Sequence, residues 1–468
     1  MCNVSLNGTQ PTDASFRVLR ALEAAGLEAW YVGGWVRDAL MGRPSHDVDM
    51  CCSGLWQESK EALEAADIAV VESGIKFGGI TAICDDERIE VTTYRLDGFY
   101  TDGRHPQSVE RAASLEDDLA RRDFTVNAMA WHPERGLVDR YDGQGDLDRK
   151  LIRAVGDPKR RFNEDALRML RAVRFACRLD FMIEPKTKQA LAECAPLLDA
   201  VARERVGIEL EGILSTGHGG DAMLRYPELV CAAVPELASA RGFDQRSVYH
   251  AFNVYEHIAR VLTVAGELAL CDGVAPSSSL MWAAFLHDVS KPECFTVDHD
   301  GSGHFYGHPE LGAKKARVIM DRLALSHDLV RDVCLLIKYH DKPLRPERSC
   351  LLNMMRALSG EGVDTPRLMD ELMDLKRADT LGKAPSCFYY VETIEEMRTL
   401  AHDLLQAGEP YTLKMLAING GDLIRAGVKP GPELGQLLNA ALDAVIEDNI
   451  PNNREALLAH LNLNYLTS

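Results

Sequence analysis

The sequence predicts an α/β region built on a small mixed sheet, followed by a chain that is helical to its end. Two observations predict this division. Before about residue 110, short apolar runs alternate with amphipathic helical segments, as in proteins whose strands and helices share one sheet. From there onward, apolar residues recur at the spacing of helices. At 468 residues, the chain has room for about three domains.

The predicted elements of the α/β region follow one another closely. Residues 14–26 have the apolar spacing of an amphipathic helix that ends at a glycine, and residues 29–32 form a short apolar run typical of a buried strand. Two glycines interrupt this run before residues 36–42, which predict a second helix. Further strands are predicted at residues 48–52, 68–72, 79–84 and 88–95.

Composition and charge narrow the possible functions. Apolar residues make up 46% and charged residues 26% of the chain, which is ordinary for a globular protein and argues against disordered, collagen-like and coiled-coil chains. The formal net charge of −19 argues against a protein that coats nucleic acid. Residues 149–178 are an exception, because they hold ten Lys or Arg and three Asp or Glu, a local net charge of +7. We expect this segment to bind phosphate groups while the acidic remainder repels other polyanions.

Cysteines and apolar stretches bear on the cellular setting. The twelve cysteines include no C-x-x-C pair, so they favour neither a zinc ribbon nor a small disulfide framework. We interpret them as reduced thiols of a cytoplasmic protein. The N-terminus has no basic segment followed by an apolar run, and no stretch reaches about 18 apolar residues, so we expect neither a signal peptide nor a membrane span.

A pair of carboxylates follows a Gly33-Gly34 turn. Asp47 and Asp49 are two residues apart, so on a strand both side chains point to one face. Such a pair can hold two Mg²⁺ ions that activate a hydroxyl and stabilise leaving pyrophosphate, and glycines at a helix start let phosphate approach. A D-x-D pair alone is usually a solvated turn, but the upstream glycines make the signal more specific. Glu90, at an outward position of a predicted strand, is either the third carboxylate or a solvent-facing residue.

A second group of charged residues lies in the basic segment. We expect a helix over residues 163–178 with Asn163 as its N-cap. Asp165 and Arg168, three residues apart, would then share one helix face. A carboxylate accepts a hydrogen bond from the amino group that cytosine and adenine both present, and an arginine donates one to the adjacent ring nitrogen, so this pair could select C and A. The alternative, which is the better one for the pair in isolation, is an ordinary ion pair within a helix.

Together, these residues resemble the class II tRNA nucleotidyltransferase and poly(A) polymerase family. The resemblance implies a nucleotidyltransferase-like α/β head at residues 1–145 and a helical neck at 146–215 that binds nucleotide and RNA. It also implies a helical body at 216–385 and a helical tail at 386–468. The segments that carry it, in the family's order, are GGWVRD, Asp47-Val48-Asp49, Glu90, RRDFTVNAMA (121–130), DRYDGQGDLDRKLIRAVGDP (139–158), EDALRMLR (164–171) and ERVGIEL (204–210).

The resemblance also implies roles for individual residues. Asp47, Asp49 and Glu90 would be catalytic, with Mg²⁺ on the two aspartates, and Glu164 would orient the base-reading pair. The residues that it assigns to nucleotide binding are Gly33, Gly34, Arg37, Arg122, Asp123, Asn127, Glu164, Asp165, Arg168 and Arg171. The candidates for RNA binding are Arg160, Arg161 and Arg174.

Histidines and aspartates further along the chain form a third group. His257, the dipeptide His287-Asp288, expected on a helix, and Asp379 follow in the order of the HD phosphohydrolase superfamily, which they resemble. The resemblance implies that these four residues bind a metal. Imidazole and carboxylate ligands together suit Mn, Fe, Ni or Zn. The alternative is a helical scaffold that keeps the residues without activity. Two further histidines would contact phosphate or a second metal: His308 and His340.

The function that these resemblances imply is the addition of CMP and AMP from CTP and ATP to the 3′ end of tRNA, with release of pyrophosphate. Residues 100–106 look like the family's flexible loop, which members that add only cytidines are expected to lack. The alternatives within the family are a poly(A) polymerase and an enzyme that adds only the terminal adenosine. An alternative of a different class is a metal phosphohydrolase acting on RNA 3′ or cyclic phosphates through the HD-type residues.

Overall fold

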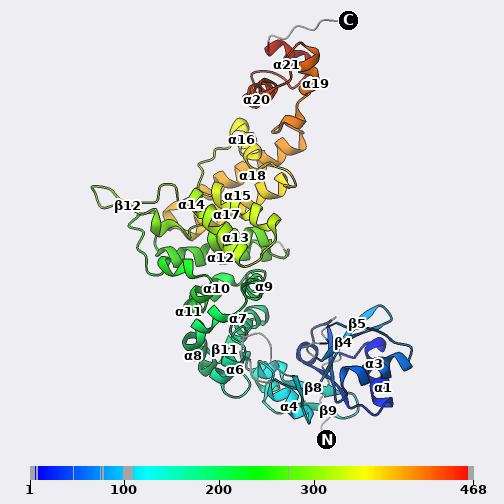
Figure 1. The fold of residues 1–468 in the computed structure, drawn as a ribbon. Coiled ribbons are helices and arrows are strands. Elements are labelled where there is room, and N and C mark those ends of the chain that lie inside the picture. The colour runs from blue at the N-terminus through cyan, green and yellow to red at the C-terminus, as the bar shows by residue number, and fades with distance from the viewer. Residues whose placement is uncertain are drawn as a thin grey trace. The chain divides into compact units, whose positions relative to one another are not determined.

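The structure, a computed structural model, describes residues 6, 9–45, 47–73, 75, 78–97, 109–271 and 273–461. The predicted loop at residues 100–106 lies outside these ranges. The chain divides into two compact units, the first made of Met1–Ile213 with Tyr226–Ala233, and the second of Leu214–Arg225 with Val234–Ser468. Figure 1 shows both units, and each is described by itself.

A seven-stranded mixed sheet, counted over the described residues, forms the base of the first unit. The strand order is β3-β4-β5-β2-β1-β8-β9, in which β2 and β5 run parallel and the other neighbours run antiparallel. This sheet confirms the predicted mixed sheet and its five predicted strands. The bounds are β1 Ala29–Val32, β2 Val48–Cys52, β3 Ala69–Val71, β4 Gly79–Cys84, β5 Glu87–Thr93, β8 Met129–His132 and β9 Gly136–Asp139.

The two faces of this sheet differ. Helices α1 (Asp13–Ala24), α2 (Gly34–Leu40) and α3 (Trp56–Ala65) pack on one face, where Met50 and Ile89 are fully buried. Because side chains alternate along a strand, Asp49 and Glu90 point to the opposite face. That second face is covered only in part among the described residues, by a cluster that includes α4 (Leu115–Ala120). The uncovered part leaves room for a ligand beside the two carboxylates.

The prediction that the chain is helical from about residue 110 is wrong at the edge of the sheet. Strands β8 and β9 form an antiparallel hairpin there, and β8 pairs with β1. All four residues of β8 are buried, so the strand lacks the alternation of apolar and polar residues that would reveal it. Gly136, with a φ of 80°, begins the return strand.

Two helices replace the single helix that was expected over residues 163–178. Helix α6 (Pro158–Glu164) starts after Asp157, whose Oδ1 accepts a hydrogen bond of 2.8 Å from Arg160 N. The prediction that Asn163 is an N-cap is therefore wrong. Asp165 has an extended backbone, with φ −146° and ψ 106°, and helix α7 (Arg168–Leu179) begins beyond it. The other helical segments of this part are α5 Gly143–Asp148, α8 Pro185–Cys194, η3 Ala195–Ala200, α9 Arg203–Leu214 and α11 Pro227–Ala233.

The second unit is almost entirely helical among its described residues, as predicted. Helix α13 (Ser278–Leu286) ends just before the His287-Asp288 dipeptide, so the expectation that this pair lies on a helix is wrong. Pro292 lies a few residues further on, and a proline disfavours a continued α-helix before it. The other helices are α10 Gly219–Arg225, α12 Val254–Cys271, α14 His308–Arg322, α15 His327–Tyr339, α16 Arg348–Leu358, α17 Thr365–Gly382, α18 Tyr390–Gln406, α19 Gly420–Arg425, α20 Pro432–Ile446 and α21 Arg454–His460.

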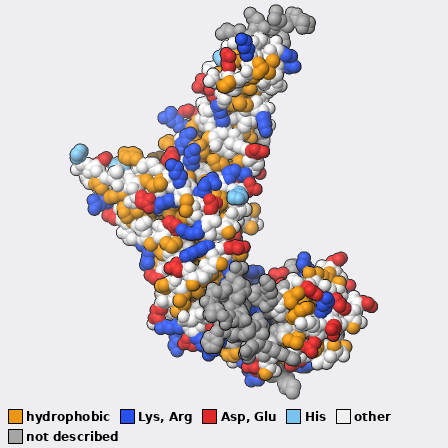
Figure 2. Space-filling view, in the orientation of Figure 1, with side chains coloured by type: hydrophobic (Ala, Val, Ile, Leu, Met, Phe, Trp, Pro, Cys, Tyr) orange, Lys and Arg blue, Asp and Glu red, His pale blue; other side chains and the backbone are white. Residues whose placement is uncertain are grey.

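The structure also shows the surface charge, the cysteines and the apolar helices that the composition brought into question. Figure 2 shows acidic and basic side chains interspersed on the face turned to the viewer, so the net negative charge is not gathered in one block there. All cysteines that the structure describes are free. None of the described helices is both long enough and apolar enough to cross a membrane.

A buried carboxylate ties α5 to the segment that precedes β8. Asp146 accepts hydrogen bonds from Thr125 Oγ1 at 2.7 Å, Arg149 Nη2 at 2.8 Å and Arg153 Nε at 2.9 Å, and its side chain is fully buried. Burial raises the pKa of Asp146, but the hydrogen bonds from Arg153, Arg149 and Thr125 hold it below its usual value. The stability that this network contributes is therefore present above the unfolded carboxylate's pKa and is lost as pH falls through the lower, folded pKa.

We predict that Asp146→Asn lowers the free energy of unfolding at pH 7 by about 1–3 kcal/mol, because Arg149 and Arg153 lose a buried charged partner but are themselves 49% and 38% exposed to solvent. The difference from the parent should begin to shrink as pH falls below about 4, where the carboxylate of the unfolded chain takes up a proton. It should vanish below the lower pKa of the folded carboxylate. Denaturant unfolding at several pH values measures both effects. Asp142→Asn is the control, because this exposed partner of Arg149 should cost no more than about 1 kcal/mol. Equal losses for the two variants would contradict the prediction.

Candidate functional site

Two carboxylates lie side by side on the open face of the sheet. The parallel pairing of β2 with β5 places Asp49 directly opposite Glu90. Asp49 is half-buried and Glu90 is exposed. Asp47 is exposed and lies two residues before Asp49, just ahead of β2. The predicted third carboxylate is thus adjacent to the D-x-D pair.

The electrostatics of these carboxylates suit a cation. Burial, and after it the charge of Glu90, raise the pKa of Asp49 to about 6, although the Arg122 guanidinium partly offsets them. Like charges held this close favour a bound cation over two free carboxylates, and hard divalent cations prefer carboxylate oxygens. The donor set therefore fits a divalent metal.

Asp49 and Glu90 line a cleft of about 450 Å³ within the first unit, whereas Asp47 does not line it. The cleft joins residues of β2 and β5 to residues of α7 and of the segment before β8. It brings together seven of the predicted site residues, which are Asp49, Glu90, Arg122, Asp123, Asp165, Arg168 and Arg171. Its other lining residues are Val32, Thr92, Arg95, Arg121, Leu167 and Arg205. The cleft thus combines a carboxylate floor with a largely basic wall.

Gly33 lies against this cleft at the turn between β1 and α2. Its φ of 69° falls in the region that glycine adopts readily. A Cβ atom at this position would lie 3.0 Å from Arg122 Nη1 and 3.6 Å from Asp49 Oδ2. The backbone therefore favours glycine here, and any larger residue would crowd the Arg122 guanidinium.

Asp118, which the sequence did not single out, positions Arg122. Its side chain is fully buried, and it accepts hydrogen bonds from Arg122 Nη2 at 3.1 Å and from Arg121 Nη2 at 2.7 Å. Burial raises the pKa of Asp118, but the guanidiniums of Arg122 and Arg121 hold it below its usual value. A charged Asp118 thus fixes Arg122 beside the catalytic candidates.

A chain of hydrogen bonds links the other predicted nucleotide-binding residues. Arg37 is buried and its Nη1 donates to Asn127 Oδ1 at 2.8 Å. Asn127 Nδ2 donates to Asp123 Oδ1 at 3.3 Å, and Arg171 Nη2 donates to Asp123 Oδ2 at 2.7 Å. Gly34 lies next to Arg37, since its Cβ would be 3.6 Å from Arg37 Nη2. The structure therefore places Arg37 and Asn127 behind the cleft, where they hold Asp123.

The base-reading candidates do not share a helix face, and that prediction is wrong. Asp165 lies in the break between α6 and α7, where its Oδ1 accepts a hydrogen bond of 3.0 Å from Leu167 N. Arg168 Nη1 donates to Glu164 Oε2 at 2.9 Å. Both Asp165 and Arg168 nevertheless line the same cleft. The break in the helix brings them together in place of the expected helical repeat.

Arg205, which the sequence did not assign a role, contacts one of these candidates. Arg205 Nη2 donates to Asp165 Oδ2 at 3.1 Å and lines the cleft. It belongs to the ERVGIEL segment on α9, so the resemblance marked its neighbourhood but not its contact. Its guanidinium sets the direction of the Asp165 carboxylate.

The three candidates for RNA binding differ in exposure, and none of them lines the cleft. The Arg160 side chain is 75% exposed. Arg161 is held inside the unit, because its Nη1 donates to Glu164 Oε2 at 2.7 Å and its Nε to Val155 O at 2.9 Å. Arg174 Nε donates to Glu209 Oε2 at 2.6 Å. Arg160 is therefore the best placed of the three for a phosphate at the surface.

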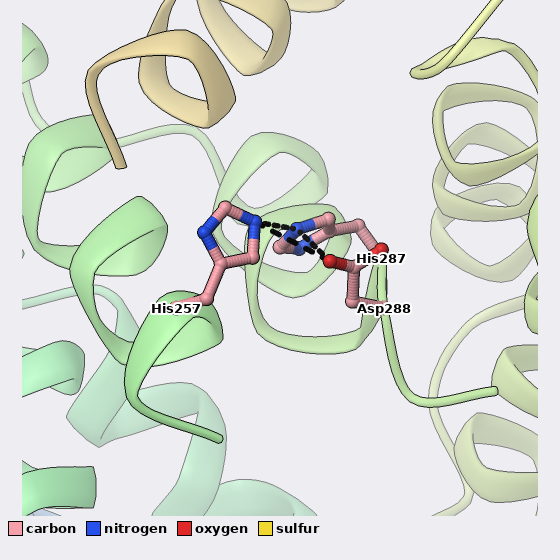
Figure 3. Close-up of side chains that lie close together, drawn as sticks. All are labelled: His257, His287 and Asp288. Carbon is pink, nitrogen blue, oxygen red and sulfur yellow. Dashed lines mark hydrogen bonds and ion pairs between the residues drawn. The ribbon is translucent and has the colours of Figure 1, made fainter. Parts of the chain in front are cut away.

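The second unit brings its predicted metal ligands together in one buried cluster. Figure 3 shows His257 on α12 converging with His287 and Asp288, which follow α13. His257 Nε2 lies 3.4 Å from His287 Nε2 and 3.3 Å from Asp288 Oδ2, and all three side chains are buried. Asp379 on α17 completes the set, with Oδ1 at 3.1 Å from His257 Nε2.

Two lysines that the sequence did not single out lie beside this cluster. Lys291 Nζ is 2.6 Å from Asp288 Oδ2, and Lys383 Nζ is 2.5 Å from Asp379 Oδ2. His250 also packs against the cluster, its ring 5.1 Å from that of His257. The sequence pattern of the superfamily identifies the candidate metal ligands, but it does not reveal that these lysine side chains lie next to them.

Models of known protein families match four parts of the chain. Residues 29–153 match the poly A polymerase head domain, and residues 180–240 match a probable RNA and SrmB-binding site of polymerase A. Residues 254–383 match the HD domain, and residues 383–461 match a putative domain 2 of tRNA nucleotidyltransferases. The matches, together with the cleft, define a nucleotidyltransferase of the poly(A) polymerase type that carries an HD domain.

Relatives that match along nearly the whole chain identify the protein family. A CCA-adding enzyme of Streptococcus thermophilus is 32% identical over 449 residues, which cover 94% of each chain. The structure of the Bacillus stearothermophilus CCA-adding enzyme in complex with CTP has a TM-score of 0.70 at 26% identity, covering 97% of this chain and 98% of that one. The Thermotoga maritima CCA-adding enzyme complexed with tRNA shares the fold, with a TM-score of 0.60 at 20% identity over 98% of both chains. The chain belongs to the family of CCA-adding enzymes.

Proposed function

We propose that this chain adds CMP and AMP, from CTP and ATP, to the 3′ end of tRNA and releases pyrophosphate. Family membership supports the reaction type. The observation that carries the proposal for this chain is the single cleft in which Asp49 and Glu90 face Asp165 and Arg168. A site for a nucleoside triphosphate needs carboxylates that hold a metal for the phosphates, and polar groups that recognise the base.

The carboxylates would hold Mg²⁺, with Asp47 and Asp49 as its ligands and Glu90 beside them. When bound, a pair of Mg²⁺ ions activates the attacking 3′-hydroxyl and neutralises charge on the leaving pyrophosphate. Arg122 and Arg171 carry positive charge into the same cleft, where they would bind the triphosphate. Asp118 and Asp123 fix these two guanidiniums, so little side-chain entropy is lost when the nucleotide binds.

Asp165 and Arg168 would select the base without a nucleic-acid template. The Asp165 carboxylate accepts a hydrogen bond from the amino group that cytosine and adenine share, and Arg168 donates one to the adjacent ring nitrogen. Uracil and guanine present a carbonyl at the same position, which the carboxylate repels. Glu164 orients Arg168, and Arg205 orients Asp165. Both reading groups are thus held by a partner of opposite charge.

Other activities of the family use the same chemistry. A poly(A) polymerase would add AMP repeatedly to unstructured RNA without adding CMP. An enzyme that adds only the last adenosine would extend tRNA ending in CC and no shorter tRNA. Both differ from our proposal in the acceptor and the nucleotide incorporated, so one assay separates all three.

A second candidate function is supported by the buried HD cluster. Four imidazole and carboxylate ligands converge there, as Mn, Fe, Ni or Zn would require. A metal so held supplies a water nucleophile for phosphoester hydrolysis. We propose this site, built from His257, His287, Asp288 and Asp379, as a separate phosphohydrolase centre that acts on RNA 3′ or cyclic phosphates.

The division of labour along the chain also remains our proposal. It assigns catalysis to a head at residues 1–145, nucleotide and RNA binding to a neck at 146–215, the HD site to a body at 216–385 and RNA contacts to a tail at 386–468. We further propose that the protein acts in the cytoplasm, for which the support is its cysteine usage.

The proposed activity is tested with tRNA that lacks its last three nucleotides, incubated with Mg²⁺ and labelled CTP and ATP. We predict incorporation of both nucleotides, and a loss of about two to three orders of magnitude in rate for Glu90→Gln, the scale on which one charge-stabilising group acts. Glu87→Gln is the control, because Glu87 lies on the same strand outside the cleft. Failure of the parent chain to incorporate either nucleotide would refute the proposal.

The two proposed centres are separated by measuring nucleotide addition and hydrolysis of cyclic phosphates on one double variant. Asp47→Asn combined with Asp49→Asn should abolish nucleotide addition, while any hydrolysis of cyclic phosphates by the second unit survives. A double variant that still adds nucleotides would show that the carboxylate site is assigned wrongly.

Gly33 provides a test of the close approach to Arg122. We predict that Gly33→Ala weakens CTP binding by up to about tenfold, because the added methyl group shifts the Arg122 guanidinium by a few tenths of an ångström. Backbone strain should also lower stability by about 1–3 kcal/mol, because Gly33 has φ 69° and ψ −132°. Gly26→Ala is a matched control: its φ is also positive, at 81°, but nothing lies within 4 Å of the added atom. Calorimetric titration with CTP and thermal unfolding measure the two effects. Equal CTP affinity in both variants would contradict the prediction.

Arg160 provides a test of RNA binding at the basic segment. If its exposed guanidinium contacts one tRNA phosphate, Arg160→Ala should reduce the slope of log K against log salt concentration by about 0.7–0.9. Arg17→Ala removes an exposed arginine of the head outside the basic segment, and should leave the slope unchanged. Filter binding of tRNA over a salt series measures the slopes, and an unchanged slope for Arg160→Ala would remove this residue from the RNA surface.

A further inference from the structure

A cavity of about 310 Å³ lies beside the HD cluster of the second unit. One side of this cavity is buried and belongs to the cluster: His308 and His340 line it, and their Nε2 atoms lie 3.4 and 3.7 Å from Asp288 Oδ1. Lys291 and Lys383 also line the cavity and carry positive charge to the same side. This side therefore suits the phosphate of a substrate.

An aromatic side chain lies at the opposite, exposed side of the cavity. Tyr306 lines the cavity and is 74% exposed. Its ring is stacked on that of His304, with the centroids 5.3 Å apart and the planes at 6° to each other. His304 also lines the cavity, and its Nε2 lies 2.7 Å from Asp298 Oδ2. A pair of parallel rings thus stands where the cavity meets solvent.

The ring pair is mounted on a short hairpin that is fixed to the rest of the unit. Strand β12 (Thr296–Val297) pairs antiparallel with β13 (Gly303–His304), and Figure 1 labels this hairpin at β12. Gly303 N donates a hydrogen bond of 2.9 Å to Arg246 O. A Cβ atom at Gly303 would overlap the carbonyl oxygen of Gln245, so the hairpin lies directly against that segment.

The chain that follows the hairpin keeps Tyr306 close to the cluster. The Phe305 ring packs against Phe295, with centroids 5.4 Å apart, and His308 Nδ1 lies 2.7 Å from Phe305 O. Consecutive Cα atoms are about 3.8 Å apart, so the Cα atoms of Tyr306 and His308 lie within about 8 Å of each other. A nucleotide whose phosphate meets His308 can therefore reach Tyr306 with its base.

Exposed aromatic rings next to positive charge are the means by which proteins bind single-stranded nucleic acid, since bases stack on the rings while cations meet the phosphates. We propose that the Tyr306–His304 ring pair stacks against the base of the nucleotide whose 3′ or cyclic phosphate enters the HD cluster. This inference rests on the phosphohydrolase function proposed for that cluster. It adds the part of the substrate that is recognised, which is the nucleobase.

Stacking of this kind recognises a base without identifying it. Every base offers a π-face, so stacking on a tyrosine tolerates all four bases. The first unit differs, because Asp165 and Arg168 are proposed there to select cytosine and adenine by hydrogen bonds. The HD cluster would accordingly accept RNA ends whatever their last base, whereas nucleotide addition would remain confined to CMP and AMP.

A competing interpretation is that Tyr306 is an ordinary surface residue that covers His304. Single exposed aromatic residues are common on protein surfaces and need no binding role. Tyr306 differs from such residues because it lines the cavity that also contains His308, Lys291 and Lys383. The two interpretations predict different effects of removing the ring on substrates with and without a base.

The test is hydrolysis, with Mn²⁺ present, of 2′,3′-cyclic AMP and of 1-deoxyribose 2′,3′-cyclic phosphate, which has no base. We expect Tyr306→Ala in the full chain to raise KM for 2′,3′-cyclic AMP about five- to 150-fold, the scale of one stacked base, and to leave kcat unchanged. The same rise is expected for 2′,3′-cyclic UMP, and none for the compound without a base. Tyr306→Phe keeps the ring and should retain the parent KM. Tyr389→Ala is the control, because this tyrosine of the same unit is 77% exposed and does not line the cavity.

An unchanged KM for 2′,3′-cyclic AMP in Tyr306→Ala would overturn the inference. An equal rise for the compound without a base would also overturn it, because the ring would then serve the phosphate, and a rise confined to one base would overturn the tolerance of all bases. Hydrolysis of none of these compounds by the parent would refute the proposed phosphohydrolase function instead. In that case calorimetric titration with 3′-AMP decides: weaker binding by Tyr306→Ala but not by Tyr306→Phe supports the stacking site, and equal affinities or no binding by the parent refute it.

Discussion

The first unit depends on the pairing of two strands that hold like charges next to each other. Parallel pairing of β2 with β5 places the Asp49 and Glu90 carboxylates side by side on a half-buried surface. The two negative charges repel each other. The relief comes from the basic wall of the cleft, above all from Arg122, and is completed by a divalent cation when one binds. The repulsion raises the free energy of the unoccupied cleft. A cation that binds there removes the repulsion, and this adds to its affinity.

The basic wall is itself held by acidic side chains. Asp118 fixes Arg122, Asp123 fixes Arg171, and Glu164 fixes Arg168. A guanidinium removed from water without a partner is expensive, and these three arginines of the cleft each have an acidic partner. These partners also restrict the motion of the arginines before a nucleotide binds. The same pairs that make the fold stable thus prepare the cleft for a triphosphate.

The sequence predicted what depends on local pattern and missed what depends on pairing between distant segments. The alternation of side chains along a strand predicted the side of the sheet on which Glu90 lies, and the spacing of apolar residues predicted helix α1. The juxtaposition of Asp49 with Glu90 did not, because it requires a register between segments about forty residues apart. The break at Asp165 was missed because its neighbours are good helix formers. Arg205 is an ordinary charged residue until its distant partner Asp165 is known. The contact of Asp118 with Arg122 is local, but its role shows only once Arg122 is placed beside the cleft. The resemblance to family motifs supplied part of this information. A motif identifies residues that come together in the folded protein, but it does not show which contacts bring them together.

The two candidate metal sites differ in ligand chemistry in a way that would keep their metals apart. The site of the first unit offers carboxylates, which suit Mg²⁺, whereas the cluster of the second unit offers four imidazoles around two carboxylates. Imidazole binds first-row transition metals far more strongly than it binds Mg²⁺, so abundant Mg²⁺ would not displace them. Conversely, carboxylates that lack imidazole neighbours retain transition metals weakly. Nucleotide addition and chemistry at the HD cluster would therefore respond to different metals, and one could be lost by metal limitation without the other.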